Sequence, residues 1–291
     1  DFETRDFKEE IVDDTFKQMY EGVLNVISQH NFTQFMLAIK SAGFISSKMV
    51  TSNMALDFAY TIHLLLQKSD VPVAERKRIV QKWYVLSALT GRYSTSPESA
   101  FARDLRQISE RGVPTMLKAM EDAILSENFW TVALPQNLNS TSTTNPTYLV
   151  YLAAQVYFND ISLLSSNITV RELISLGGDV HHIFPKKYLM KNTYSKNFYN
   201  QEANYAYLDR PVNESIGMRA PKDYFSLALK QCETKQAECG SIIDADFLKV
   251  NLAANCIPEN ICDLDCDLYP EFLEQRRLLM AQKIRSYYES L

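Results

Sequence analysis

The sequence predicts a mainly α-helical protein, in which a helical scaffold carries one small strand–loop–strand–helix motif. The chain of 291 residues contains only 8 glycines and is rich in Leu, Ala, Lys, Glu and Gln, which favours helix. Along most of the chain, apolar residues recur at spacings of three and four, the period of a helix with one buried face. Only two short segments have the branched and aromatic content of strands.

The composition excludes several classes of protein. With 46% hydrophobic and 22% charged residues, the chain resembles an ordinary folded protein rather than a disordered one. No apolar run reaches the roughly 20 residues needed to span a bilayer, so no membrane partner is expected. The five cysteines form no C-x-x-C pair, which fits neither a disulfide framework nor a zinc ribbon. We therefore expect a cytoplasmic protein with reduced thiols.

Residues 1–165 are expected to form the helical scaffold. Gly43, Gly91 and Gly112 are predicted to close three of its helices, and Pro97 to start one. Helices are predicted over 16–29, 32–43, 54–68, 73–91, 99–112 and 149–158. Because residues 133–148 are rich in Asn, Ser, Thr and Pro, they are predicted to be a loop.

Residues 166–230 are expected to form the small motif. A helix near 171–176 is broken by two glycines, and residues 180–184 then predict a short strand that ends at Pro185. Residues 204–209 predict a second strand, and Pro211 then starts a brief helix. The remaining segment, 231–291, is predicted to be helical, most clearly over 271–291; a further helix is predicted over 222–231.

The motif also coincides with the basic part of the chain. Between residues 181 and 230 there are eight Lys or Arg and four Asp or Glu, whereas the whole chain has a net charge of −5. A local basic patch can bind phosphates even on an acidic protein. The candidate phosphate contacts are Lys186, Lys187, Lys191, Lys196 and Arg210, although each is equally compatible with a solvated loop charge.

Two of the four histidines, His181 and His182, are adjacent on the first predicted strand. They are followed at fixed spacing by Asn200, Asn204 and Asn213. In this order the residues resemble the HNH, or His-Me finger, nucleases, which share a ββα-metal motif. Those proteins carry a ligand and a base on the first strand, an asparagine opening the second, and a ligand on the helix.

The resemblance implies a role for each residue. His181 and Asn213 would be the metal ligands, and His182 and Asn204 the catalytic residues, with Asn200 in support. An imidazole has the ordinary pKa closest to neutrality, so His182 suits a general base that deprotonates water. Asn204 would hold the histidine's strand by hydrogen bonds to backbone across the loop. Many relatives have zinc-binding C-x-x-C pairs around the finger; without them, the surrounding helices must hold the motif.

The cofactor implied is one divalent cation, which would bind the scissile phosphate and stabilise the leaving oxygen. With so few protein ligands, water and phosphate oxygens would complete its shell, as is typical of Mg²⁺. Imidazole is a softer ligand than Mg²⁺ prefers, so Mn²⁺, Ni²⁺ and Zn²⁺ stay open as alternatives.

The resemblance extends over roughly residues 50–230. The strings KWYVLSALTGRYSTSPESAFARDL, DVHHIFPKKYL and NYAYLDRPVNESIGMRAPKDYF are similar to the C-terminal half of proteins that join a ParB-like N-terminal domain to an HNH-type end. GmrSD-type modification-dependent restriction enzymes are an example. The DGQQR-like motif of their N-terminal half does not occur in this sequence. A ParB-like domain or separate subunit is therefore an expected partner, as is DNA.

The sequence thus predicts a metal-dependent DNA endonuclease, the effector half of a modification-dependent restriction or phage-defence protein. An RNA-directed nuclease differs only in its substrate. The alternative from another class is a non-catalytic helical module with a degenerate HNH finger, which binds DNA or a protein and regulates without cutting.

Overall fold

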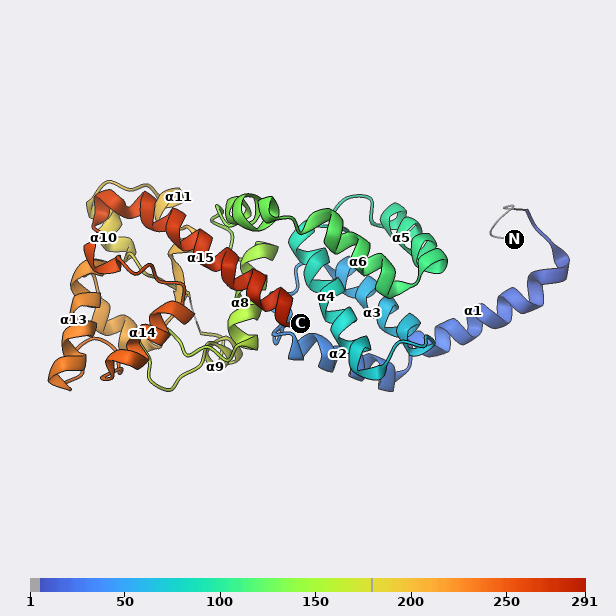
Figure 1. The fold of residues 1–291 in the computed structure, drawn as a ribbon, viewed down its shortest axis with the longest axis horizontal. Helices are drawn as coiled ribbons and strands as arrows, with labels where there is room; N and C mark the ends of the chain where they lie inside the picture. The colour runs from blue at the N-terminus through green and yellow to red at the C-terminus, as the bar shows by residue number, and fades with distance from the viewer. Residues whose placement is uncertain (1–5, 179) are drawn as a thin grey trace.

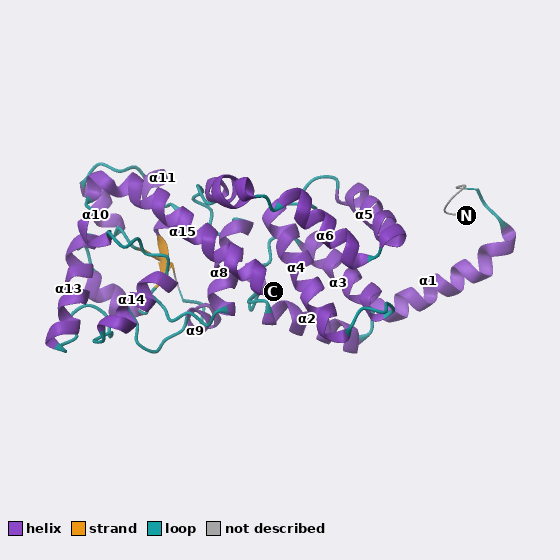
Figure 2. Cartoon of the chain, viewed as in Figure 1, coloured by secondary structure: helices purple, strands orange, loops and turns teal. Residues whose placement is uncertain are grey.

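The computed structural model describes residues 6–178 and 180–291 and is mainly helical, with a single two-stranded sheet in that described part (Figure 2). The molecule is elongated (Figure 1). Helices α2 to α6 form one end and α10 to α14 the other; α8 lies between them, and α15 runs from the second end to the middle of the molecule. None of the described helices is long and apolar enough to cross a bilayer.

In the end of the molecule formed by residues 6–124, the structure confirms the predicted helices. It also contains α6, which was not predicted. Gly91 closes α4 in the left-handed conformation, at φ 60°, as its place in the sequence predicted. The elements are the short 3₁₀ helices η1 (Glu9–Ile11) and η2 (Ser47–Met49), and α1 (Val12–Val26), α2 (Gln29–Ser41), α3 (Asn53–Gln67), α4 (Val73–Thr90), α5 (Pro97–Arg111) and α6 (Val113–Ile124).

The middle of the molecule corrects the loop predicted over 133–148, which was wrong at both ends. A π-helical turn, η3 (Phe129–Ala133), runs into α7 (Leu134–Asn137), whose apolar Leu134 is fully buried. Helix α8 (Pro146–Tyr157) already starts at Pro146, because proline suits the first helical position and the Asn145 side chain accepts a hydrogen bond from the Thr147 N–H at 3.2 Å. The burial of Leu134 and the cap from Asn145 therefore favour helix in a segment whose polar composition predicted a loop.

The other end contains the two strands, β1 (Val180–His182) and β2 (Tyr205–Tyr207), which pair antiparallel with His182 opposite Tyr205. Both strands are shorter than predicted; β1 ends early because the Phe184 N–H and C=O bond to the Asn204 side chain instead of a partner strand. Helices α10 and α11 were not predicted, whereas α14 lies in the segment 231–291 that was expected to be helical. The helices are α9 (Val170–Ser175), α10 (Lys186–Lys191), α11 (Lys196–Tyr199), η4 (Glu202–Asn204), α12 (Arg210–Ile216), α13 (Pro221–Thr234), α14 (Ala245–Ala254), η5 (Ile261–Asp263), η6 (Cys266–Leu268) and α15 (Tyr269–Ser290).

One continuous hydrophobic core runs through all three predicted segments. Helix α15 crosses the middle of the molecule and packs against α7, α8 and η4 (Figure 1). Phe184, just beyond β1, packs its ring against Tyr269 and Phe272 of α15, with ring centroids 5.0 and 4.7 Å apart. The C-terminal helix α15 therefore stabilises the end of β1 through these aromatic contacts.

A buried polar network holds α4 against α5 in the segment 82–105. The Asp104 carboxylate is fully buried and accepts two hydrogen bonds from the Arg92 guanidinium, each 2.7 Å long. It also accepts one from the Tyr93 hydroxyl at 2.9 Å, and Trp83 donates to that hydroxyl at 3.2 Å. Paired in this way, the carboxylate and guanidinium are structural parts of the scaffold.

Candidate functional site

An open pocket of about 410 Å³ brings together half of the ten residues singled out by the sequence. His181 and His182 of β1, Lys186 and Lys187 of α10, and Asn213 of α12 all line it. The pocket lies between β1, the start of α10 and the C-terminal half of α12. Residues more than thirty positions apart in the chain thus share one surface.

The imidazole of His182 is oriented by its surroundings. Its Nε2 lies 3.0 Å from the Oδ1 of Asn200, and its ring packs edge-on against Tyr205, with centroids 5.2 Å apart. Because an amide oxygen can only accept, Nε2 is the protonated nitrogen in this hydrogen bond. The neutral ring therefore carries its free lone pair on Nδ1.

Burial lowers the pKa of His182; the hydrogen bond that its ring donates to Asn200 opposes this, and the nearby Lys186 and His181 lower the pKa further. The net direction is below the ordinary value of 6.5, so the neutral imidazole dominates at pH 7. A neutral imidazole is the form that can accept a proton from water.

Asn204 is fully buried and does not line the pocket. Its Oδ1 accepts a hydrogen bond from the Phe184 N–H at 2.8 Å. Its Nδ2 donates to the carbonyl oxygens of Phe184 at 3.1 Å and Tyr199 at 3.0 Å. These bonds tie the end of the histidine strand to the loop that follows, so Asn204 is a positioning residue rather than one that would touch a substrate.

The pocket offers a donor set suited to a hydrated divalent cation. His181 and Asn213 are both partly exposed there, so water can reach a cation bound between them. The described residues contain no cluster of three or more His, Cys, Asp or Glu that could hold a metal ion. A cation at this place therefore depends on the mixed imidazole and carboxamide pair, with water in the remaining positions.

The five candidate phosphate contacts divide into two groups. Lys186 and Lys187 line the pocket, whereas Lys191, Lys196 and Arg210 are exposed outside it. The Arg210 guanidinium forms an ion pair with Glu214 on the same helix, 2.7 Å long and well exposed.

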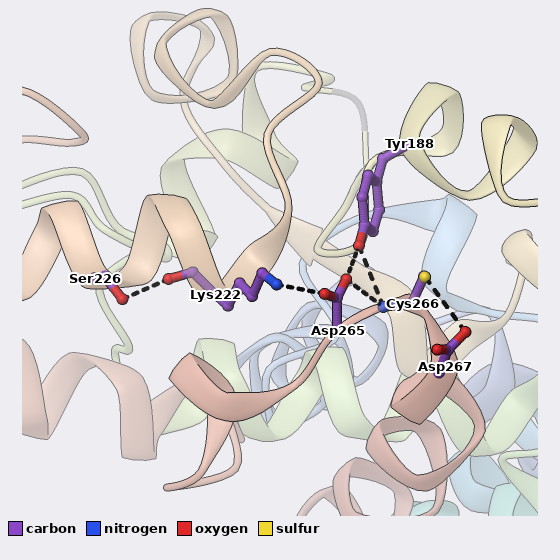
Figure 3. A network of polar contacts seen from close by, with 6 residues as sticks. All are labelled: Tyr188, Lys222, Ser226, Asp265, Cys266 and Asp267. Carbon is purple, nitrogen blue, oxygen red and sulfur yellow. Dashed lines mark hydrogen bonds and ion pairs between the residues drawn. The ribbon is translucent and has the colours of Figure 1, made fainter.

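Helix α10, which carries Lys186 and Lys187, is anchored through Tyr188 by a polar network around Asp265 (Figure 3). The Asp265 carboxylate accepts hydrogen bonds from the Tyr188 hydroxyl and the Cys266 N–H and pairs with the Lys222 ammonium. The hydrogen bond from Lys222 is the main cause of the lowered pKa of Asp265, which keeps this carboxylate ionised. The network connects α10 to α13 and η6 and fixes the direction of α10.

Sequence reasoning missed two residues of this region. Glu214 also lines the pocket and brings a carboxylate to it, one position after Asn213. Its position next to the predicted metal ligand Asn213 is the sequence feature that could have identified it. Arg276 of α15 is buried and donates to the carbonyls of Ala203 and Tyr205 at 2.8 and 2.7 Å. No local pattern marks it, because its partners are backbone atoms far away in the chain.

Comparison of the chain with protein-family models, curated proteins and solved structures finds no match.

Proposed function

We propose that this protein is a metal-dependent endonuclease that hydrolyses DNA phosphodiester bonds through an HNH-like ββα finger formed by β1, β2 and α12. The observation that carries the proposal is the shared pocket of His181, His182 and Asn213. These three were selected from the sequence by residue type, spacing and the resemblance to HNH nucleases. Their common pocket is the arrangement that the resemblance requires of a base and two ligands.

The roles proposed for the chain's own residues follow from their contacts. His182 takes a proton from water at Nδ1, because Nε2 is held by Asn200. Asn204 holds the strand that presents this imidazole. Lys186 and Lys187 bind the phosphates that flank the scissile bond, since both ammonium groups border the same pocket.

His181 and Asn213 are the residues that would hold the divalent cation. When bound, the cation supplies positive charge to the scissile phosphate and the leaving oxygen. Mg²⁺ is the first choice because water would supply most of its ligands, and Mn²⁺, Ni²⁺ and Zn²⁺ are alternatives that accept imidazole more readily.

The wider proposal concerns the biological setting. As the effector half of a restriction or phage-defence protein, the chain would cut DNA that a ParB-like domain or subunit selects. This part is supported only by the resemblance in residues 50–230.

The test is cleavage of supercoiled plasmid by the purified protein with Mg²⁺ or Mn²⁺. We expect nicked or linear product, loss of cutting on addition of a chelator, and a decrease of at least about 100-fold in His182→Ala, because general-base catalysis contributes about 10²–10⁴-fold. His30→Ala is the matched control, since His30 is exposed and lies outside the pocket.

Cutting that survives in His182→Ala would contradict this site. Plasmid binding without cutting under every metal would favour the alternative, a binding module with a degenerate finger. An RNA substrate in parallel decides between the two nucleic acids.

A further inference from the structure

Helix α1 is an amphipathic arm whose apolar face is not covered by any of the residues that the structure describes. It projects away from the body (Figure 1), and none of its residues is buried. Five exposed apolar residues repeat at alternating spacings of four and three, which places them on one face: Val12, Phe16, Met19, Val23 and Val26. A helix of 15 residues that buries nothing is marginal in water, so this face calls for a partner.

The base of the arm is fixed rather than loose. The Tyr60 hydroxyl donates to the Val26 carbonyl at 2.9 Å, and the Asn31 side chain donates to the Asn25 carbonyl at 3.0 Å. The Ser28 side chain then caps α2, accepting from the Asn31 N–H at 3.4 Å. The direction of the arm is therefore set by α2 and α3, and its apolar face is presented outward.

A hollow of about 590 Å³ lies on the same end of the molecule, between α2, α3 and the start of α4. Two of the side chains that line the hollow, Leu37 and Val73, are apolar and more than half exposed. Among the described residues, four ionisable side chains line it: His30, His63, Arg76 and Lys77. Arg76 and Lys77 supply its positive charge, because burial lowers the pKa of His63 and keeps that ring neutral.

The charges of the arm and the hollow are complementary. Residues 6–27 carry six acidic and two basic side chains. An acidic amphipathic helix therefore matches a hollow lined by apolar and basic side chains, which combines a helix-in-groove contact with electrostatic steering.

We propose that two copies of the chain exchange their arms, each α1 lying in the α2–α3–α4 hollow of the other copy. Such a dimer is closed by a two-fold axis and uses the same two surfaces twice. This inference does not depend on the proposed nuclease activity.

Pairing of the two arms with each other is the competing arrangement, because the apolar repeat also fits a coiled coil. Two arms of the same acidic charge repel one another, whereas the hollow offers opposite charge. The charges therefore favour the hollow as the site that accepts the arm.

Sedimentation of the full chain over a range of concentrations tests the proposal. We expect a dimer, and at least about 100-fold weaker association in an arm variant, Phe16→Asp with Met19→Asp, and in a hollow variant, Leu37→Asp with Lys77→Glu. Lys40→Glu is the matched control, because Lys40 is exposed on α2 but does not line the hollow. All these positions are exposed, so circular dichroism should show unchanged folding.

The decisive measurement is a one-to-one mixture of the arm variant and the hollow variant. The hollow variant keeps an intact arm and the arm variant keeps an intact hollow, so each mixed pair can form one of the two contacts. The mixture should therefore form dimers that neither variant forms alone. A monomeric wild-type chain overturns the proposal. So does a hollow variant that still dimerises, which is the result of arm-to-arm pairing, or a mixture that stays monomeric.

Discussion

Asn200 orients the imidazole of His182 through one hydrogen bond, with 3.0 Å between Nε2 and Oδ1. Replacing it with leucine removes the acceptor and allows the ring to rotate or change tautomer. For the proposed reaction we expect kcat to fall about 10–100-fold, as for other residues that orient a reactive side chain, with little change in KM. Steady-state cleavage kinetics measure both constants.

Asn197→Leu is the control for this substitution, because Asn197 is exposed on α11, the helix that Asn200 follows. An equal loss of kcat in the control, or a loss confined to KM in Asn200→Leu, would argue against an orienting role.

Glu202 connects the pH dependence of stability to a single buried carboxyl group. It is fully buried, its Oε2 accepts from the Asn145 side chain at 3.0 Å, and burial raises its pKa from 4.5 to about 7. Between these two pKa values the folded protein keeps a proton that the unfolded chain has released. This group therefore favours folding most below pH 4.5, and its contribution is lost as the pH rises through 7.

Glu202→Gln should remove this dependence, because the amide keeps an acceptor for Asn145 and carries no charge. We expect the variant to be more stable than wild type at pH 8 by about 2–3 kcal/mol and the difference to shrink towards pH 5. Urea unfolding at several pH values gives the comparison. A difference that does not vary with pH would show that Glu202 does not titrate in this range.

At the scale of elements, α15 stabilises β2 through Arg276. The buried guanidinium donates to the carbonyls of Ala203 and Tyr205, which have no solvent access. Arg276→Met would leave both acceptors unpaired, so we expect the free energy of unfolding to fall by about 2–4 kcal/mol. Arg277→Met, at the half-buried neighbouring position, should cost less than about 1 kcal/mol. Urea midpoints with unchanged slopes would measure both, and equal costs would contradict the role of Arg276.

Elements were predictable from the sequence where the signal is local. The apolar spacing of residues 54–68 and the left-handed glycine after α4 are patterns within a few residues, and the structure confirms them. The candidate pocket residues came from their types and spacing together with the resemblance to HNH nucleases, and the structure places His181, His182 and Asn213 around one pocket. By contrast, α7 was missed because its helical state depends on the burial of Leu134. Arg276 was missed because its partner Ala203 lies 73 residues away.

At the scale of the whole molecule, the continuous core predicts a single unfolding transition. The chain contains a spectroscopic probe in its N-terminal part and a chemical probe in its C-terminal part. The only tryptophans, Trp83 and Trp130, lie in residues 1–165, whereas the buried Cys232, Cys239 and Cys256 lie in 231–291. We expect tryptophan fluorescence and thiol reactivity to report the same denaturant midpoint. Separate midpoints would mean that the predicted segments unfold independently.

The path of α15 also has a consequence for how the site is assembled during translation. Both strands leave the ribosome before the helix that supplies Arg276, Phe272 and Tyr269 to their rear face. A nascent chain that has not yet released α15 therefore lacks the support that holds the histidine strand and its asparagine clamp. Because α15 is synthesised last of these elements, the proposed cleavage site cannot reach its folded arrangement while the chain is still growing.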